Sequence, residues 1–444
     1  MSLRKLTTLS ILLLTVACSS PVPTDTPTPA ASPTPTRAIN VTAAPPWLAY
    51  VSDDRLILNN PDGSGRTVLA TFDVVSNPQL FPSPDGQWLA VLNGLEPVLT
   101  LYHLPDGAVK ATFPLVSKSG LTPVQKAAFN TFYNMYMAYI AGWSPDGHYL
   151  AFDSVRDGSS SNLYVYNPTD DSITRLTRST VNAFRFTWAP DSANIVFEEL
   201  DTMQPSGSSA VLDVYAVHPD GSQLRMLYQP LSYDEHFLGW ASSNTLAVTT
   251  LTEQGYLYTR LFNINTLTAS PLYNGLANKT AFDPDSGTLA FTSTSNMTGT
   301  GTLPAGIYLA TAKSPPALVT NGDWVLLAWL PGLQSFFVTA PANANDLAVT
   351  PQGTTTTYNE TVMPVASFDQ RWLAFPTTTG LRVYATDGFL YRSPTKDSVD
   401  LALWQPNADS LYYLSNGQLF YLANLDAATV LIDQHVQQLK WVGE

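Results

Sequence analysis

The chain repeats one pattern of hydrophobic and polar positions from end to end. Its clearest copy is WSPDGHYLAF, residues 143–152, in which two short apolar runs flank a polar turn. Pro145 pre-sets the second turn position, Asp146 caps its own backbone, and Gly147 accepts a positive φ. Apolar runs joined by such a turn predict a β-hairpin. We therefore interpret Asp146 as a turn residue rather than a catalytic carboxylate.

Imperfect copies of this hairpin define nine units of about 40 to 50 residues between Trp47 and the C-terminus, each readable as four short strands, A to D. Strand A is expected to end at Pro82, Trp143, Trp188, Trp240, Phe282, Trp329, Phe368, Trp404 and Trp441. Strand B follows each turn, as in WLAV from Trp88 and WLAF from Trp372. The B strand that begins at Trp47 has no A strand before it.

These residues resemble the TolB-type, WD40-like (PD40) β-propeller repeat family. The W-S-P-D-G-x-x-L-A-F pattern carries the likeness, which covers nearly everything from Trp47 onward. The resemblance implies an all-β fold, a single closed β-propeller of four-stranded antiparallel blades arranged radially. The unit around Ser335 is the least typical, so the repeats allow eight or nine blades. TolB itself carries an N-terminal α/β domain that this chain replaces with a signal and linker, so no Tol-system role is implied.

The two ends of the repeat region complement each other. The last residues, Val436 to Glu444 (VQQLKWVGE), have the pattern of an A strand, and the N-terminal unit lacks that strand. We expect the C-terminal strand to complete the first blade. This arrangement closes the ring and removes two exposed sheet edges.

One segment departs from the β pattern. Thr122-Pro123 resembles a helix N-cap followed by proline at the first helical position, and apolar residues then recur at spacings of three or four. These features predict an amphipathic helix inserted at about residues 122–138. Phe129, Tyr133 and Tyr136 lie off its apolar stripe. Such a helix either plugs or caps the ring or takes part in binding, and the sequence leaves both readings open.

The N-terminus resembles a bacterial lipoprotein signal. Arg4 and Lys5 precede a short apolar run, and TVAC, ending at Cys18, resembles a lipobox. The run is far shorter than the ~20 residues of a spanning helix. The resemblance implies that residues 1–17 are a signal peptide and that Cys18 is acylated. Residues 18–46 then form a Pro/Thr-rich tether, roughly 85 Å long at ~3.1 Å per residue, and residues 47–444 form the propeller.

Composition narrows the partners. Apolar residues make up 45% of the chain, enough for a large core, and charged residues only 13%. A net charge of −14 argues against nucleic acid or an anionic lipid surface as the main partner. The single cysteine excludes an intramolecular disulfide. We expect a monomer that touches the membrane only through its lipid anchor.

No motif assigns catalytic chemistry. The five histidines lack metal-ligand spacing, and the sequence contains neither a nucleophile elbow nor a phosphate-binding loop. Asp283 to Gly287 faintly suggests a calcium loop, but it occupies the A–B turn slot. Nine of the ten tryptophans end A strands or begin B strands, and Trp324 lies beside an A strand, so blade packing is favoured over ligand platforms. We therefore predict no catalytic residue, metal site or cofactor.

The leading hypothesis is an extracytoplasmic propeller, lipid-anchored to the bacterial cell membrane or surface, that binds a protein, peptide or glycan. The alternative is an extracytoplasmic propeller enzyme, a glycan- or lactone-directed hydrolase or lyase with its site in the central channel. A polar cluster where the A strands line the channel would distinguish an enzyme from a binding module.

Strand direction predicts which face binds. Successive strands alternate, so A–B and C–D turns share one face (the turn face), and B–C loops and D–A crossovers share the other (the loop face). The turns are short, whereas the insertions at 116–138, 156–161, 201–210, 229–236 and 296–305 fall on the loop face. Insertions gathered on one face of a repeat fold commonly mark the binding face. The candidate binding residues are Phe129, Tyr133, Tyr136, Arg156, Tyr233, Asp234 and Glu235.

The anchoring hypothesis yields a direct prediction. Replacing Cys18 with serine removes the only thiol that can be acylated. We expect Cys18→Ser to abolish labelling by a fatty-acid probe and to move the protein out of the membrane fraction. Labelling of the variant at the wild-type level would refute lipidation at this residue.

Overall fold

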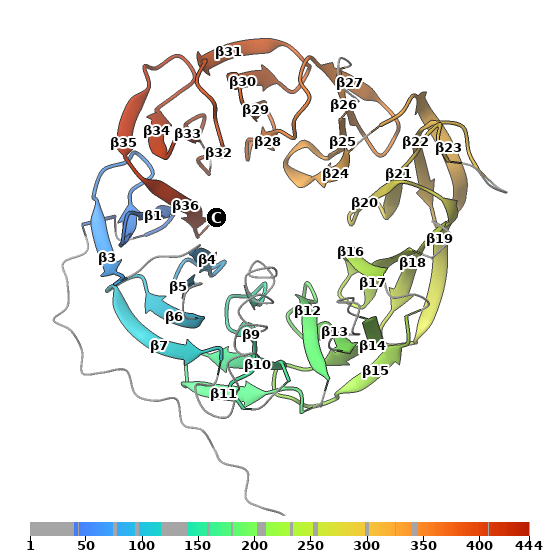
Figure 1. The fold of residues 1–444 in the computed structure, drawn as a ribbon, viewed down its shortest axis with the longest axis horizontal. Coiled ribbons are helices and arrows are strands. Elements are labelled where there is room, and N and C mark those ends of the chain that lie inside the picture. Colours follow the sequence, from blue (N-terminus) through green and yellow to red (C-terminus); the bar gives the residue numbers. More distant parts are fainter. Residues whose placement is uncertain are drawn as a thin grey trace, which may run out of the picture.

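A computed structural model describes residues 40–42, 44–73, 78–93, 97–116, 140–157, 160–178, 181–201, 210–230, 234–251, 256–297, 302–324, 326–339, 345–406 and 408–443. Their strands form nine four-stranded antiparallel sheets arranged as the blades of a closed ring around a central channel (Figure 1). The all-β propeller is thus confirmed, and the blade number is nine. Among these residues no helix is long and apolar enough to cross a bilayer.

The strands follow one order in every blade, from the channel outwards. Blade 1 contains β36 (Val436–Val442), β1 (Trp47–Ser52), β2 (Arg55–Asn59) and β3 (Thr67–Thr71). Blade 2 contains β4 (Gln79–Pro82), β5 (Trp88–Asn93), β6 (Val98–His103) and β7 (Ala108–Pro114). Blade 3 contains β8 (Ala141–Trp143), β9 (Leu150–Ser154), β10 (Asn162–Asn167) and β11 (Ser172–Arg175).

The next three blades continue the series. Blade 4 contains β12 (Asn182–Trp188), β13 (Ile195–Asp201), β14 (Ala210–Val217) and β15 (Arg225–Tyr228). Blade 5 contains β16 (Asp234–Ser242), β17 (Thr245–Leu251), β18 (Tyr256–Asn263) and β19 (Thr268–Leu276). Blade 6 contains β20 (Lys279–Asp283), β21 (Thr288–Ser293), β22 (Gly306–Thr311) and β23 (Ser314–Asn321).

The last three blades return to the N-terminal one. Blade 7 contains β24 (Leu326–Leu330), the short 3-10 helix η2 (Pro331–Leu333), β25 (Ser335–Thr339), β26 (Asp346–Val349) and β27 (Thr355–Tyr358). Blade 8 contains β28 (Val365–Ala366), β29 (Trp372–Thr377), β30 (Gly380–Ala385) and β31 (Leu390–Thr395). Blade 9 contains β32 (Leu401–Trp404), β33 (Leu411–Ser415), β34 (Gln418–Leu422) and β35 (Val430–Asp433).

The C-terminal strand closes the ring, as the sequence predicted. β36 pairs with β1 in antiparallel register, with Leu48 opposite Trp441 and Tyr50 opposite Leu439. A polar contact also joins this blade to blade 9, because the Tyr50 hydroxyl in β1 donates to Asp433 Oδ2 in β35 at 3.0 Å. Residues from the two ends of the chain therefore build one blade.

The core consists of apolar wedges between neighbouring blades. One wedge combines Ala151 and Leu163 of blade 3 with Ala183, Ile195 and Phe197 of blade 4. A B strand such as β9 contributes to the wedges on both of its sides and is buried along its whole length. This burial explains why the B strands are almost continuously apolar in sequence.

Tryptophan side chains tie the inner strands of successive blades together. The Trp143 indole N–H donates to the Phe81 carbonyl of the preceding blade at 2.9 Å. The same bond recurs around the ring, from Trp188 to Gly142 O, Trp404 to Val365 O and Trp441 to Trp404 O, and Trp240 reaches Thr187 Oγ1 instead. These contacts support the packing role expected of the tryptophans.

The A–B turns have the predicted chemistry. Ser144 Oγ donates to Asp146 Oδ1 at 2.6 Å, and the backbone N–H of His148 donates to the same oxygen at 3.0 Å. Burial alone would raise the pKa of Asp146, but these hydrogen bonds hold that pKa below its usual range. Gly147 takes φ 76°, as the turn requires. Asp146 is therefore a turn residue, and equivalent Ser–Asp contacts occur at Ser83 and Ser367.

Two expectations need correction. Phe368 does not end an A strand: β28 stops at Ala366, and Phe368 lies in the following turn, in the slot that Pro145 fills in blade 3. The segment 229–236 is not entirely loop either, because β16 begins at Asp234. The expected helix at 122–138, the signal peptide 1–17 and residues 18–39 of the tether lie outside the described residues.

The closing strand gives a stability prediction. Trp441 is 1% exposed and bonds to the preceding blade, so Trp441→Ala should cost about 3–5 kcal/mol in unfolding free energy. Deleting residues 435–444 should destabilise the protein further, because it uncovers β1 along its whole edge. Thermal and urea unfolding measure both effects.

Lys440→Ala is the matched control, since Lys440 is an exposed neighbour in the same strand and should change stability by less than about 0.5 kcal/mol. A truncated chain that melts like the full chain would rule out β36 as the closing strand.

Candidate functional site

The structure separates short turns from longer connections as strand direction requires. The A–B turns of blades 3 and 4 touch, since the Asp146 N–H donates to Ser192 Oγ at 3.1 Å. The segment that precedes β1 lies on this turn face, because Pro45 packs against Gly86 in the A–B turn of blade 2. A Cβ atom added at Gly86 would lie 2.8 Å from Pro45 Cγ. The opposite loop face is formed by the B–C loops and the D–A crossovers.

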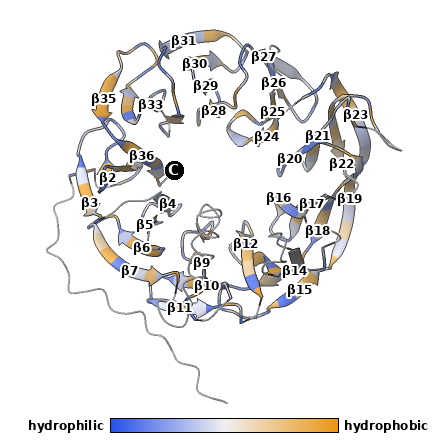
Figure 2. Ribbon diagram, viewed as in Figure 1, coloured by the Kyte–Doolittle hydropathy of each residue, from blue (hydrophilic) through white to orange (hydrophobic). Residues whose placement is uncertain are grey.

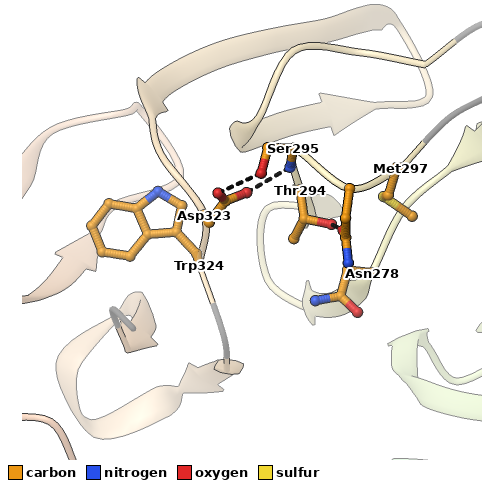
Figure 3. Close-up of a pocket in the computed structure, with 7 residues that line it drawn as sticks. Asn278, Thr294, Ser295, Met297, Asp323 and Trp324 are labelled. Carbon is orange, nitrogen blue, oxygen red and sulfur yellow. Dashed lines mark hydrogen bonds between the residues drawn. The ribbon is translucent and has the colours of Figure 1, made fainter. Parts of the chain in front are cut away.

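A pocket of about 540 Å³ opens on the loop face between blades 6 and 7 (Figure 3). Three connections build it. Asn278 comes from the crossover between blades 5 and 6, residues 294–297 from the B–C loop of blade 6, and Asp323 and Trp324 from the crossover between blades 6 and 7. We call these seven lining residues the loop-face pocket.

Polar groups and two apolar surfaces line the loop-face pocket. Asp323 accepts hydrogen bonds from Ser295 N at 2.6 Å and Ser295 Oγ at 2.7 Å, and these bonds lower the pKa of Asp323, so its carboxylate is ionised at neutral pH. Trp324 and Met297 supply the apolar surfaces, and Asn278 and Asn296 supply exposed amides. Such a lining suits a ligand that combines hydroxyl or amide groups with an apolar face.

Two smaller hollows of about 390 Å³ each lie on the outer wall, against the outermost strands. One lies between β23 and the C–D turn of blade 7, at residues 351–353, and the other between β19 and the C–D turn of blade 6. Each is shaped by single strands and short turns rather than by converging connections.

A polar cluster lies where the inner strands of blades 4 and 5 line the channel. Both strands carry β-bulges, between Phe184 and Thr187 in β12 and between Phe237 and Gly239 in β16. Within the first bulge, Arg185 Nη1 donates to the Glu235 carbonyl at 3.3 Å and lies 3.4 Å from His236 Nδ1. The same nitrogen lies 3.7 Å from Glu198 Oε2, a carboxylate with no exposed surface.

A buried ion pair lies behind this cluster. Arg260 Nη2 contacts Glu235 Oε2 at 2.9 Å, and Thr250 Oγ1 donates to the same oxygen at 2.6 Å. The guanidinium also lies over the Tyr228 ring, 4.9 Å from its centroid. Burial, reinforced by the negative charge of Glu235, raises the pKa of Tyr228 well above its usual value. We call Arg185, Glu198, Glu235, His236 and Arg260 the channel-wall cluster.

Metal binding has no geometric basis in the part of the chain that the structure describes. No group of three or more His, Cys, Asp or Glu side chains there is placed to hold a metal ion. Asp283 to Gly287 forms the A–B turn of blade 6, in which Asp285 N donates to Asp283 Oδ1 at 3.0 Å.

The predicted binding residues are only partly described. Phe129, Tyr133, Tyr136 and Tyr233 lie outside the described residues, as do Cys18 and the side chain of Asp234. Arg156 lies half-buried in the B–C loop of blade 3, with Nε 3.8 Å from Asp157 and its guanidinium over the Tyr164 ring. Glu235, expected in an exposed loop, is fully buried in β16.

Sequence reasoning assembled neither site, although it named Glu235 of the channel-wall cluster and the loop-face insertion 296–305 that contributes to the pocket. Glu198 carried one usable signal, since it stands among three acidic residues in the second half of a B strand, IVFEELD, that begins apolar. Arg185, Asn278, Asp323 and Trp324 carried none. They lie in a bulged inner strand and in connections that join different blades, so only the packing of neighbouring blades brings them to these sites.

Comparison with known proteins supports the fold. No protein-family model matches the sequence, and no curated protein matches it. A eukaryotic initiation factor structure is 12% identical over 89% of this chain and 98% of its own, with a TM-score of 0.60. Porphyromonas gingivalis dipeptidyl peptidase 4 is 13% identical over 82% of this chain and 62% of its own, with a TM-score of 0.51.

TolB from Acinetobacter baumannii is also among the similar structures, at 16% identity over 64% of this chain and 66% of its own. Its TM-score of 0.32 is too low to add to the argument. At these identities the first two comparisons establish a shared propeller fold and nothing about activity.

The buried ion pair yields a stability prediction. Arg260→Met leaves Glu235 buried without its charge partner and should cost about 3–5 kcal/mol. The double variant Glu235→Leu, Arg260→Met removes both charges and should recover most of that loss. Urea unfolding of the two variants and the wild type measures the difference.

The pair Arg371–Asp369 on the turn face is the matched control, and Arg371→Met should leave the urea midpoint nearly unchanged because solvent screens an exposed ion pair. If Arg260→Met unfolds at the wild-type urea concentration, the pair does not stabilise blade 5.

Proposed function

We propose that this chain is an extracytoplasmic β-propeller lipoprotein with TolB-like repeats that binds a protein, peptide or glycan through its loop face. In this proposal Cys18 carries the lipid, residues 18–46 hold the ring away from the membrane, and the protein acts as a monomer. The propeller fold and the repeated hairpins support the proposal, and the lipobox-like N-terminus supports the anchor.

The loop-face pocket is the observation that carries the proposal. Connections from three neighbouring blades converge on it, and it offers amide, hydroxyl and carboxylate groups beside two apolar side chains. Ligand sites in proteins commonly combine apolar walls with a few placed polar groups. The chain enters the ring on the opposite face, beside Gly86, so a tethered propeller would present the pocket away from the membrane.

A second candidate function is a propeller enzyme acting on a glycan or lactone in the central channel. The channel-wall cluster favours it, since an arginine and a histidine lie on the innermost strands of blades 4 and 5 and two buried carboxylates lie beside them. Carboxylates and a histidine that lie this close together can serve as general acids and bases. Turnover of a glycan or lactone that is lost in a His236→Ala variant would favour this function over binding alone.

The binding proposal is tested at the loop-face pocket. Asn278 and Asn296 are exposed, so the double variant Asn278→Ala, Asn296→Ala should fold normally while losing two amides that face a ligand. We expect binding to captured protein, peptide-array or glycan-array ligands to weaken about tenfold. Surface plasmon resonance on the ligands so identified measures the change.

The control is Asp220→Asn in the C–D turn of blade 4, on the turn face, which should leave binding unchanged. A second loop-face variant replaces residues 118–137 with a Gly/Ser linker. If both loop-face variants keep every ligand and Asp220→Asn loses them, binding has been assigned to the wrong face.

A further inference from the structure

Arg185, on the innermost strand of blade 4, has one edge of its guanidinium without a polar partner among the described residues. All of its polar contacts with the described residues go through Nη1, to the Glu235 carbonyl, His236 and Glu198. Nε and Nη2 contact no acceptor there, and the side chain is 30% exposed. These two nitrogens form the edge that pairs with a carboxylate through two parallel hydrogen bonds.

The backbone holds this arginine in a costly conformation. Arg185 has φ 44°, in the left-handed region, within the bulge of β12. A non-glycine residue in that region costs of order 1–3 kcal/mol and persists where the surroundings fix it. Bulges are often found where a strand redirects a side chain beside a functional site. Here the bulge lies in the innermost strand of blade 4, next to the channel (Figure 1).

The neighbouring charges favour a single negative charge on the ligand. Glu198 and Glu235 balance Arg185 and Arg260, so the channel-wall cluster is neutral when His236 is uncharged. Contacts with Glu198 and the Glu235 carbonyl fix Nη1 and orient the rest of the guanidinium. A dianion such as phosphate would bring two negative charges to a protein of net charge −14, and Arg185 alone would offset them. A singly charged ligand is therefore favoured.

We propose that Arg185 anchors a carboxylate-binding site on the channel wall between blades 4 and 5. The ligand carboxylate pairs with Nε and Nη2, and Nη1 keeps its contacts with the wall. The site is separate from the loop-face pocket, which lies between blades 6 and 7, and it requires neither that pocket nor a catalytic step. Its ligand is a carboxylate carried by a molecule narrow enough to enter the channel.

The test uses matched pairs of probes that differ only at the carboxylate. One pair is an N-acetylated tripeptide as the free acid and as the C-terminal amide, and the other is methyl glucuronide and methyl glucoside. Calorimetric or NMR titration of the full chain should show at least one acid binding about tenfold to a hundredfold more tightly than its neutral partner. The pair that shows the preference identifies the source of the carboxylate.

Two variants test whether the preference for the acid probe comes from the planar Nε–Nη2 edge of Arg185. Arg185→Gln should abolish the difference between acid and neutral probes, and Arg185→Lys, which keeps the charge but not the planar fork, should reduce it at least about tenfold. Arg371→Gln, a highly exposed arginine on the turn face, should leave the difference unchanged. The ratio of affinities is the readout, because a purely structural role for Arg185 would change stability without changing this ratio.

Two outcomes would overturn the proposal. One is the absence of any acid preference in both probe pairs at millimolar concentrations. The other is a preference that survives in folded Arg185→Gln. Either result is independent of the loop-face variants, so this site and the proposed function succeed or fail separately.

Discussion

The indole N–H bond between successive inner strands is the interaction on which the ring depends most. Each inner strand is the edge of its sheet, so the backbone groups on its channel side have no ladder partner. Trp143, Trp188, Trp404 and Trp441 donate to carbonyls of the preceding inner strand and join the blades at their narrowest point. The apolar wedges further out then fill the widening space between blades.

Much of the fold could be predicted because each hairpin encodes its own turn and its own buried strand. The ends were predictable for a related reason, since a lone B strand and a lone A strand can bury their edges only against each other. The outer strands were harder to locate. β23 (SPPALVTN) and β31 (LYRSPT) are half exposed and contain proline, which an edge strand tolerates and a sequence pattern does not mark as strand. Phe368 was misplaced because it is an apolar residue in a turn slot that holds proline elsewhere.

The sites could not be predicted because they arise between repeats. Arg185 meets Glu235 across 50 residues of sequence, and Ser295 meets Asp323 across 28, at contacts that form only when blades pack and their connections converge. Both lie where the repeat pattern weakens. Bulges distort the inner strands of blades 4 and 5, and the tryptophan slot of blades 6 and 8 holds Phe282 and Ala366, which have no donor side chain. The hydropathy of the ribbon does not mark the sites either, because apolar and polar positions are interspersed all around the ring (Figure 2).

Completing one blade from both ends of the chain also constrains how the molecule folds. Tyr50 of blade 1 and Asp433 of blade 9, which meet where the ring closes, are separated by 383 residues, so the contact forms only after nearly the whole chain is available. Contacts between such distant residues slow folding, because the entropy of a large loop is lost before any contact compensates for it. During synthesis from the N-terminus, β1 therefore waits with an unpaired edge while the other eight blades assemble. The nascent ring is most prone to misassociation during this interval, and the final residues to emerge end it.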